Sequence, residues 1–160
     1  MAEQQLVMYE EEFVQIQAVV DRLLRDAMAK VVMLVDMNGQ LIAQSGETDH
    51  LDIVGLAVLT AGNVAATGGI ARILRETGFA IQFHEGEKAN IYTFLVSNRL
   101  ILEVVFDART SPGLVRLRLK KAGEALAQIL VALSAKQNQP GFDLHFADIT
   151  DEDIDNLFND

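Results

Sequence analysis

The sequence predicts an α+β domain in which five strands form a mostly antiparallel sheet against three helices, in the order α-ββ-α-βββ-α. Segments whose apolar residues recur at helical spacing alternate with short runs of β-branched and aromatic residues. The links between successive strands are short, which favours antiparallel neighbours. Of the 160 residues, 50% are apolar and 22% are charged, a composition that supports one domain with a packed core.

The first helix is predicted over residues 9–29. Ile16, Val20 and Leu23 fall at helical spacing within one apolar stripe. Three glutamates stand at positions 10–12 in the first turn, where the helix dipole favours acidic side chains. Together these signals predict an amphipathic helix.

A hairpin follows this helix. Residues 31–35 are a short β-branched and apolar run, and residues 40–43 continue as the second strand. Between them, Asn38-Gly39 is a pair typical of a type I′ turn.

The middle helix, predicted over residues 51–77, has an unusual composition. The nineteen residues from 53 to 71 include no Asp, Glu, Lys or Arg, whereas a surface helix of a monomer should carry a charged outer face. Its four glycines each cost about 1 kcal/mol relative to alanine. Because small residues let another backbone approach closely, we expect burial on both sides, with the sheet on one and another chain on the other.

Three alternatives compete for this helix. About twenty apolar residues can span a bilayer, but Gly, Thr and Asn make this run weakly hydrophobic, so we expect no membrane insertion. It could instead be the core helix of a monomer, covered by its own chain. Its glycines could also belong to a phosphate-binding loop, but no Gly-Lys-Ser/Thr sequence follows them.

The second half of the domain is predicted to contain three strands and a long helix. Ser111 followed by Pro112 has the pattern of an N-cap and a first helical residue, and opens a helix that runs to about residue 136. A tight link at residues 97–99 favours a hairpin. The strands are expected at residues 79–84, 91–97 and 100–107.

The C-terminal residues form a separate unit. Pro140-Gly141 lies where the helical pattern stops, so we divide the chain into a domain over residues 1–138 and a tail over 139–160. The tail is predicted to be a flexible linker followed by a short acidic amphipathic helix. Such a helix is too short to be stable alone and is expected to fold against its own domain or a partner. Its apolar anchors are Phe146, Ile149, Ile154, Leu157 and Phe158.

Charge is distributed unevenly along the chain. The net charge is −10, and residues 143–160 contain seven acidic residues and no Lys or Arg. The rest is nearly balanced, which argues against nucleic acid as a partner because phosphate binding needs clustered cations. A cationic stretch on the last helix is either a solvated face or a contact for an acidic partner, with the chain's own tail among the candidates. It consists of Arg116, Arg118, Lys120 and Lys121.

Catalytic chemistry is hard to find in this sequence. The chain has no cysteine, and its serines lack a nucleophile-elbow context. His50, His84 and His145 show no metal-ligand spacing. We therefore predict no catalytic residue, metal or cofactor. No signal-peptide pattern follows Met1, so a cytoplasmic protein is expected.

Six stretches of the chain resemble one known family. Together with the element order, they make nearly the whole chain similar to the roadblock/dynein-light-chain family, and in particular to its bacterial members that regulate the Ras-like GTPase MglA in cell polarity and gliding motility. The stretches are QLVMYEEEF (5–13), KVVMLVDMNGQLI (30–42), LTAGNVAATGG (59–69), QFHEG (82–86), FDARTSPGLVRLRLKKA (106–122) and DEDIDNLF (151–158).

The resemblance implies an arrangement of the fold and its partners. One helix would cover one face of the sheet and two the other. Roadblock proteins form homodimers with their middle helices side by side and their sheets joined edge to edge. The paired helices would face the nucleotide site of MglA, while the tail would reach a separate surface of it. The residues implied for the middle-helix contact are Ala57, Ala61, Val64, Ala65, Gly68, Gly69 and Arg72.

The implied activity is GTPase activation by a homodimer that is enriched at a cell pole. Some activators insert an arginine, for which Arg72, Arg75 and Arg109 are the candidates here. The middle helix, without a charged residue from 53 to 71, argues against insertion and favours repositioning of the GTPase's own catalytic Arg and Gln. Two alternatives stay open: a non-catalytic homodimeric scaffold, and a regulator of nucleotide exchange, especially through the tail.

Overall fold

The computed structural model describes residues 9–138. The tail that the sequence predicts over residues 139–160 lies outside the described residues, as do residues 1–8. The same holds for the five predicted tail anchors, Phe146, Ile149, Ile154, Leu157 and Phe158.

Five strands form a single antiparallel sheet in the order β2-β1-β5-β4-β3. The central strands are β1 (Val31–Asp36) and β5 (Leu100–Phe106), which pair along their whole length. β2 (Leu41–Gly46) forms one edge of the sheet. β4 (Asn90–Val96) joins the centre to β3 (Ile81–Glu85), which forms the other edge. The structure confirms the predicted α-ββ-α-βββ-α order.

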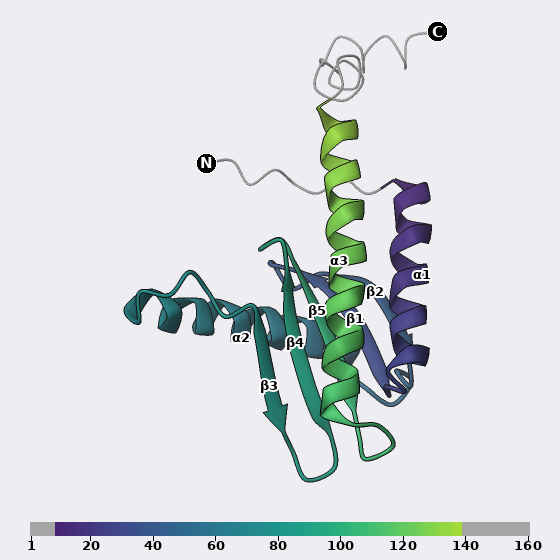
Figure 1. The fold of residues 1–160 in the computed structure, drawn as a ribbon, viewed down its shortest axis with the longest axis vertical. Coiled ribbons are helices and arrows are strands. Elements are labelled where there is room, and N and C mark those ends of the chain that lie inside the picture. Colours follow the sequence, from purple (N-terminus) through teal and green to yellow (C-terminus); the bar gives the residue numbers. More distant parts are fainter. Residues whose placement is uncertain (1–8, 139–160) are drawn as a thin grey trace, which may run out of the picture.

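Three helices cover the two faces of this sheet. α1 (Glu10–Asp26) and α3 (Pro112–Gln137) lie side by side on one face. α2 (Ile53–Ile73) crosses the opposite face, and its C-terminal part extends beyond β3 (Figure 1). The implied arrangement of one helix on one face and two on the other is therefore confirmed. Because α2 projects past the edge of the sheet, only part of the helix can pack on the strands.

The central strands are buried on both faces, which explains their continuous apolar sequence. In β1, Val32 and Leu34 join the core beneath α1 and α3. Met33 and Val35 point the other way and join a smaller core beneath α2. Successive side chains of a strand alternate between its faces, so one strand supplies both cores.

Side-chain caps begin two of the helices. Ser111 Oγ accepts a hydrogen bond from the Leu114 amide at 3.3 Å, which confirms the predicted N-cap of α3. Asp52 Oδ1 accepts one from the Gly55 amide at 2.9 Å at the start of α2. These bonds satisfy amides that have no partner within the first helical turn.

The turn between β1 and β2 differs from the prediction. In this connection only Gly39 has a positive φ (+89°), whereas a type I′ turn needs two such residues. The Asp36 carboxylate accepts from the amides of Asn38 and Gln40 and stabilises a different turn. The type I′ prediction for this turn is wrong. Two positive-φ residues instead connect β4 to β5, at Ser97 (52°) and Asn98 (54°).

An ion pair joins the N-terminal end of α1 to the C-terminal end of α3. Lys136 Nζ contacts the carboxylate of Glu12, which is almost fully buried, and lies 3.3 Å from Glu11 Oε2. The hydrogen bond from Lys136 holds the pKa of the Glu12 carboxyl below its usual value, against the opposing effect of burial. This contact helps to set the alignment of the two helices along their length.

Candidate functional site

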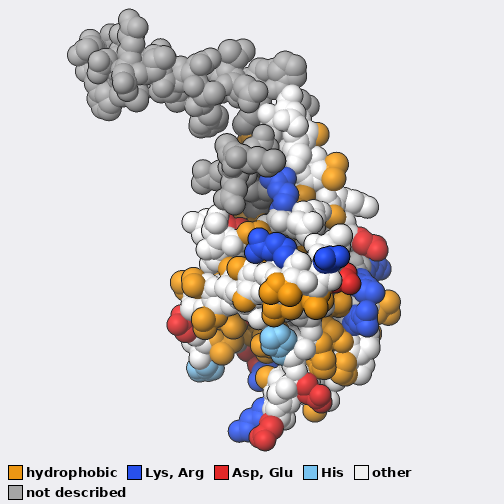
Figure 2. Space-filling view, turned by 90° about the vertical axis from the view of Figure 1, so that its left-hand side faces the viewer, with side chains coloured by type: hydrophobic (Ala, Val, Ile, Leu, Met, Phe, Trp, Pro, Cys, Tyr) orange, Lys and Arg blue, Asp and Glu red, His pale blue; other side chains and the backbone are white. Residues whose placement is uncertain are grey.

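The outward side of α2 carries a continuous apolar face, which we call the open α2 face. Its large members include Leu59 and Ile73, whose side chains are 73% and 83% exposed. Figure 2 looks at the molecule from the end toward which α2 projects, and hydrophobic side chains gather in the middle of this view. The open α2 face consists of Val54, Val58, Leu59, Gly62, Ala65, Ala66, Ile70 and Ile73.

The inward side of α2 is made mainly of small residues. Ala57, Ala61 and Val64 are buried against Met33, Val35 and Ile101 of the sheet. Their small side chains let the helix axis lie close to the strands. These three residues of the predicted middle-helix contact therefore face their own sheet.

The other four residues of the predicted middle-helix contact remain accessible. Ala65 and Gly68 are exposed, Gly69 is half-buried, and Arg72 is exposed in the last turn of the helix. Three residues of the predicted set are thus buried and four are accessible in the single chain. Larger apolar residues that were not among those implied by the resemblance, Leu59 and Ile73 among them, occupy the outer side.

Two glycines of α2 have room for a larger side chain as far as the described residues are concerned. A Cβ atom built at Gly62 or Gly68 would meet no heavy atom within 4 Å. Glycine in a helix interior nonetheless costs about 1 kcal/mol relative to alanine. The absence of an internal clash favours a close approach from outside the chain at these positions.

Polar side chains tie α2 to the edge strand β3. Gln82 Nε2 donates to Thr67 Oγ1 at 2.8 Å, and Asn63 Nδ2 donates to Gln82 Oε1 at 3.3 Å. β3 pairs only with β4 among the described residues, so the backbone groups of its outer edge are unpaired there. An apolar helix face and an open strand edge therefore lie next to each other, and both are features that a partner chain can cover.

A buried carboxylate lies beneath α2. Glu103 on β5 is only 3% exposed, and its Oε2 accepts a hydrogen bond from Thr60 Oγ1 of α2 at 2.8 Å. Thr93 Oγ1 of β4 donates to the same oxygen at 3.4 Å, while Oε1 has no partner among the described residues. Burial raises the pKa of this carboxyl, and the hydrogen bonds from Thr60 and Thr93 oppose the shift.

Glu103 is expected to make the stability of the domain pH-dependent. Because its pKa is higher in the folded than in the unfolded protein, the folded state binds more protons between the two values. The free energy of unfolding of the wild type should therefore fall as pH rises above about 4.5. It should level off above the raised pKa. Denaturant unfolding of the wild type and Glu103→Gln between pH 4 and 8 measures the difference between them, and a difference that stays constant with pH would contradict this account.

The three candidate arginines have different surroundings. Arg109 Nε lies 3.0 Å from Asp107 Oδ1, and Arg109 Nη1 lies 3.8 Å from Glu47 Oε1. Arg72 and Arg75 at the end of α2 are exposed and form no ion pair within residues 9–138. Of the three, these two lie beside the open α2 face and could reach a partner docked there.

The described part of the chain has no candidate metal site. No group of three or more His, Cys, Asp or Glu side chains within it could hold a metal ion. One helix there, α2, is long and apolar enough by length and composition to cross a membrane, which on its own is weak evidence. The inner side of this helix packs against the sheet and bonds to Glu103 and Gln82.

Sequence reasoning missed the pair formed by Thr60 and Glu103. A signal was present, because Glu103 is the single acidic residue in the apolar run Leu100–Phe106. A lone acid in a strand buried on both faces must find a hydrogen-bond donor inside the protein. The uncharged α2 opposite offered Thr60 as that donor.

The fold and the open α2 face define a small α+β domain with one apolar helix face that the rest of the described chain leaves uncovered. Residues 15–106 match the family model described as Roadblock/LC7 domain. No curated protein sequence matches the chain. The structural similarities are more specific than the family model.

Among the solved structures that resemble most of this chain, three are described as MglB. MglB from Myxococcus xanthus is 58% identical, with a TM-score of 0.76 over 80% of this chain and 96% of that one. The gliding protein MglB from Thermus thermophilus is 32% identical, with a TM-score of 0.75 over 82% and 99%. A structure described as MglB with a tetrameric arrangement is 31% identical, with a TM-score of 0.76 over the same shares. The chain belongs to the Roadblock/LC7 family, among its MglB proteins.

Proposed function

We propose that this chain is a GTPase-activating protein for the Ras-like GTPase MglA, acting as a homodimer in cell polarity and gliding motility and enriched at a cell pole. The observation that carries the proposal is the open α2 face in a chain similar to MglB proteins. An apolar helix face is unfavourable in water when it is exposed. A partner that covers the open α2 face would explain why this face carries no charged residue.

Homodimer formation is part of the proposal. Two copies of α2 could pack side by side through the open α2 face, with Gly62 allowing the backbones to come close. The outer edge of β3 would then pair with its counterpart and extend the sheet across the dimer. The solved MglB structure with a tetrameric arrangement is consistent with self-association of this type.

The proposed mechanism uses the catalytic residues of the GTPase and none from this chain. A docked dimer would hold the GTPase's own Arg and Gln in the orientation needed for hydrolysis, which supplies positioning and electrostatic stabilisation. The middle of the open α2 face supports this, because it offers shape and apolar contact without a cation. The competing mechanism, in which this chain inserts an arginine into the GTPase active site, would use Arg72 or Arg75 at the end of this face.

Substitution of these two arginines separates the mechanisms. We expect Arg72→Ala and Arg75→Ala to change single-turnover GTP hydrolysis by less than about threefold under saturating conditions, since an inserted arginine is worth roughly 1,000-fold or more. The measurement is phosphate release from GTP-loaded GTPase with excess activator. Loss of hydrolysis while binding is retained would show that an arginine of this chain enters the active site.

The proposed activity itself is tested by comparing phosphate release by the GTPase with and without the full chain. Acceleration is expected. Binding without acceleration would leave a non-catalytic scaffold, and faster release of a fluorescent GDP analogue without faster hydrolysis would identify an exchange regulator. The same assays on a variant truncated after Gln139 show which of these activities depends on the tail.

A further inference from the structure

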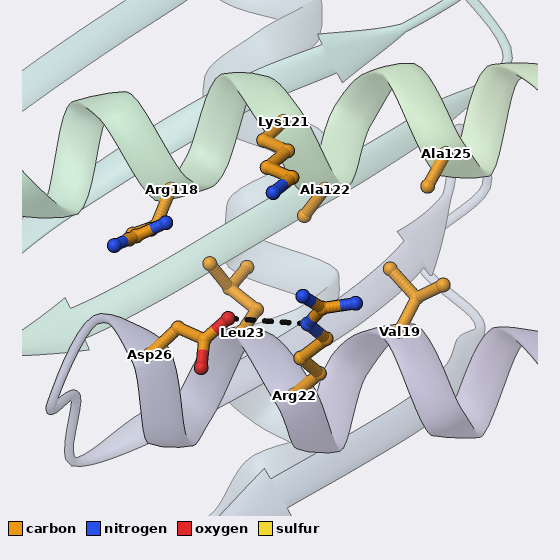
Figure 3. A pocket seen from close by; sticks show the side chains of 8 residues that line it. All are labelled: Val19, Arg22, Leu23, Asp26, Arg118, Lys121, Ala122 and Ala125. Carbon is orange, nitrogen blue, oxygen red and sulfur yellow. Dashed lines mark hydrogen bonds and ion pairs between the residues drawn. The ribbon is translucent and has the colours of Figure 1, made fainter.

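A groove with an apolar floor and a basic rim lies between α1 and α3, on the face of the sheet opposite to α2. Figure 3 shows side chains of both helices pointing into it. The rim carries three cations and one acidic residue. The floor consists of Val19, Leu23, Ala122 and Ala125, and the rim of Arg22, Asp26, Arg118 and Lys121.

The charges around this groove are incompletely paired. Asp26 is bonded to Arg22, with 3.2 Å between Arg22 Nε and Asp26 Oδ2. Arg118 is half-buried, and its Nε is inaccessible to solvent yet has no acceptor among the described residues. An unpaired buried donor is destabilising, and more so if it is charged. Arg118 also forms no ion pair within residues 9–138, so a carboxylate from outside this range could pair with its guanidinium group.

We propose that the groove is the docking site for the C-terminal segment of the same chain, residues 150–158. This segment contains four acidic residues and no Lys or Arg. Ile154, Leu157 and Phe158 fall at helical spacing and would lie on the apolar floor, while the acidic side chains meet the basic rim. The proposal divides the cationic stretch of α3: Arg118 and Lys121 line the groove, whereas the other two cations, Arg116 and Lys120, do not.

The linker is long enough for docking within one chain. From Gln137 back to Ala122 the path along α3 is about 22 Å at 1.5 Å per residue. Residues 138–149 can span up to roughly 40 Å when extended. A tether of this length gives an effective concentration in the millimolar range, far above that of a second copy at micromolar protein. The segment of the same chain is therefore favoured as occupant.

Docking of the tail would also control its availability. A segment held in the groove cannot contact another surface at the same time, so the groove would set the fraction of tails free to bind the GTPase. That consequence rests on the proposed function, whereas the docking does not and can be tested without the GTPase.

Cross-linking of paired cysteines in the full chain tests the proposal, because the sequence contains no cysteine. One cysteine is placed in the groove by Ala125→Cys and one in the tail by Asn159→Cys, and a short bis-maleimide is added. The matched control moves the first cysteine to Val131→Cys, which is 71% exposed on α3 and closer along the helix to the tail. We expect intramolecular cross-linking at least tenfold faster for position 125 than for position 131.

Charge reversal supplies the second arm of the test. Arg118→Glu with Lys121→Glu is expected to slow cross-linking at position 125 about tenfold, and Asp151→Lys with Asp155→Lys should restore it. Equal rates at positions 125 and 131 in the chain with native charges would overturn the proposal whether or not the charge variants fold. A predominance of dimer-sized products would overturn docking within one chain. Failure of this test leaves the GTP hydrolysis assay unaffected.

Discussion

The double substitution Leu59→Arg with Ile73→Arg is expected to abolish self-association and, with it, stimulation of the GTPase. Both side chains are largely exposed in the single chain, so the domain should still fold. In the proposed dimer each would leave water, which is worth about 1.5–3 kcal/mol per side chain, and each arginine would instead bury an unpaired charge. We expect the dissociation constant of the dimer to rise at least 100-fold, which corresponds to about 2.7 kcal/mol of binding free energy.

Sedimentation or light scattering across a concentration series measures this effect, and phosphate release measures its functional consequence. The control carries the same changes at two exposed apolar residues of α3, Leu117→Arg with Val131→Arg. This control should keep the oligomeric state and activity of the wild type. If the α2 double variant stayed dimeric at wild-type affinity, the open α2 face would not be the interface.

The second large effect is expected at the contact between α3 and the sheet. A Cβ atom at Gly123 would lie 2.3 Å from Cε1 and 2.9 Å from Cδ1 of Phe94 on β4, well inside normal contact distance. Gly123→Val should force the ring out of its packed position and lower the free energy of unfolding by about 3 kcal/mol. For a domain of this size the melting temperature should fall by roughly 10 °C.

Gly113→Val in the same helix is the matched control, because a Cβ atom there meets no heavy atom within 4 Å. It should change stability by less than about 1 kcal/mol. A double-mutant cycle with Phe94→Leu identifies the cause, since the smaller side chain should relieve part of the cost of Gly123→Val. Additive effects of the two substitutions would show that the clash with Phe94 is not responsible.

Local signals were enough to place most elements. Acidic residues in the first turn of α1 and the Ser111-Pro112 pair before α3 act within a few residues of the chain, so they can be read without the fold. Element ends shifted by a few residues, as for α2, predicted over 51–77 and observed as Ile53–Ile73. The type I′ prediction at Asn38-Gly39 was wrong because the Asp36 carboxylate accepts hydrogen bonds from amides of the loop and stabilises another turn geometry.

The sequence by itself determined the α+β class, the element order and the unusual status of α2, because periodicity and missing charge are properties of the chain alone. Only the tertiary structure decided which side of α2 faces inward. A helix without a polar side gives no signal of its orientation, and steric fit then selects the side. Ala57 and Ala61 lie against the sheet since a close approach buries Met33 and Ile101, which leaves Leu59 and Ile73 outside. The same packing placed Thr60 over Glu103, a pairing across 43 residues that only the fold brings together.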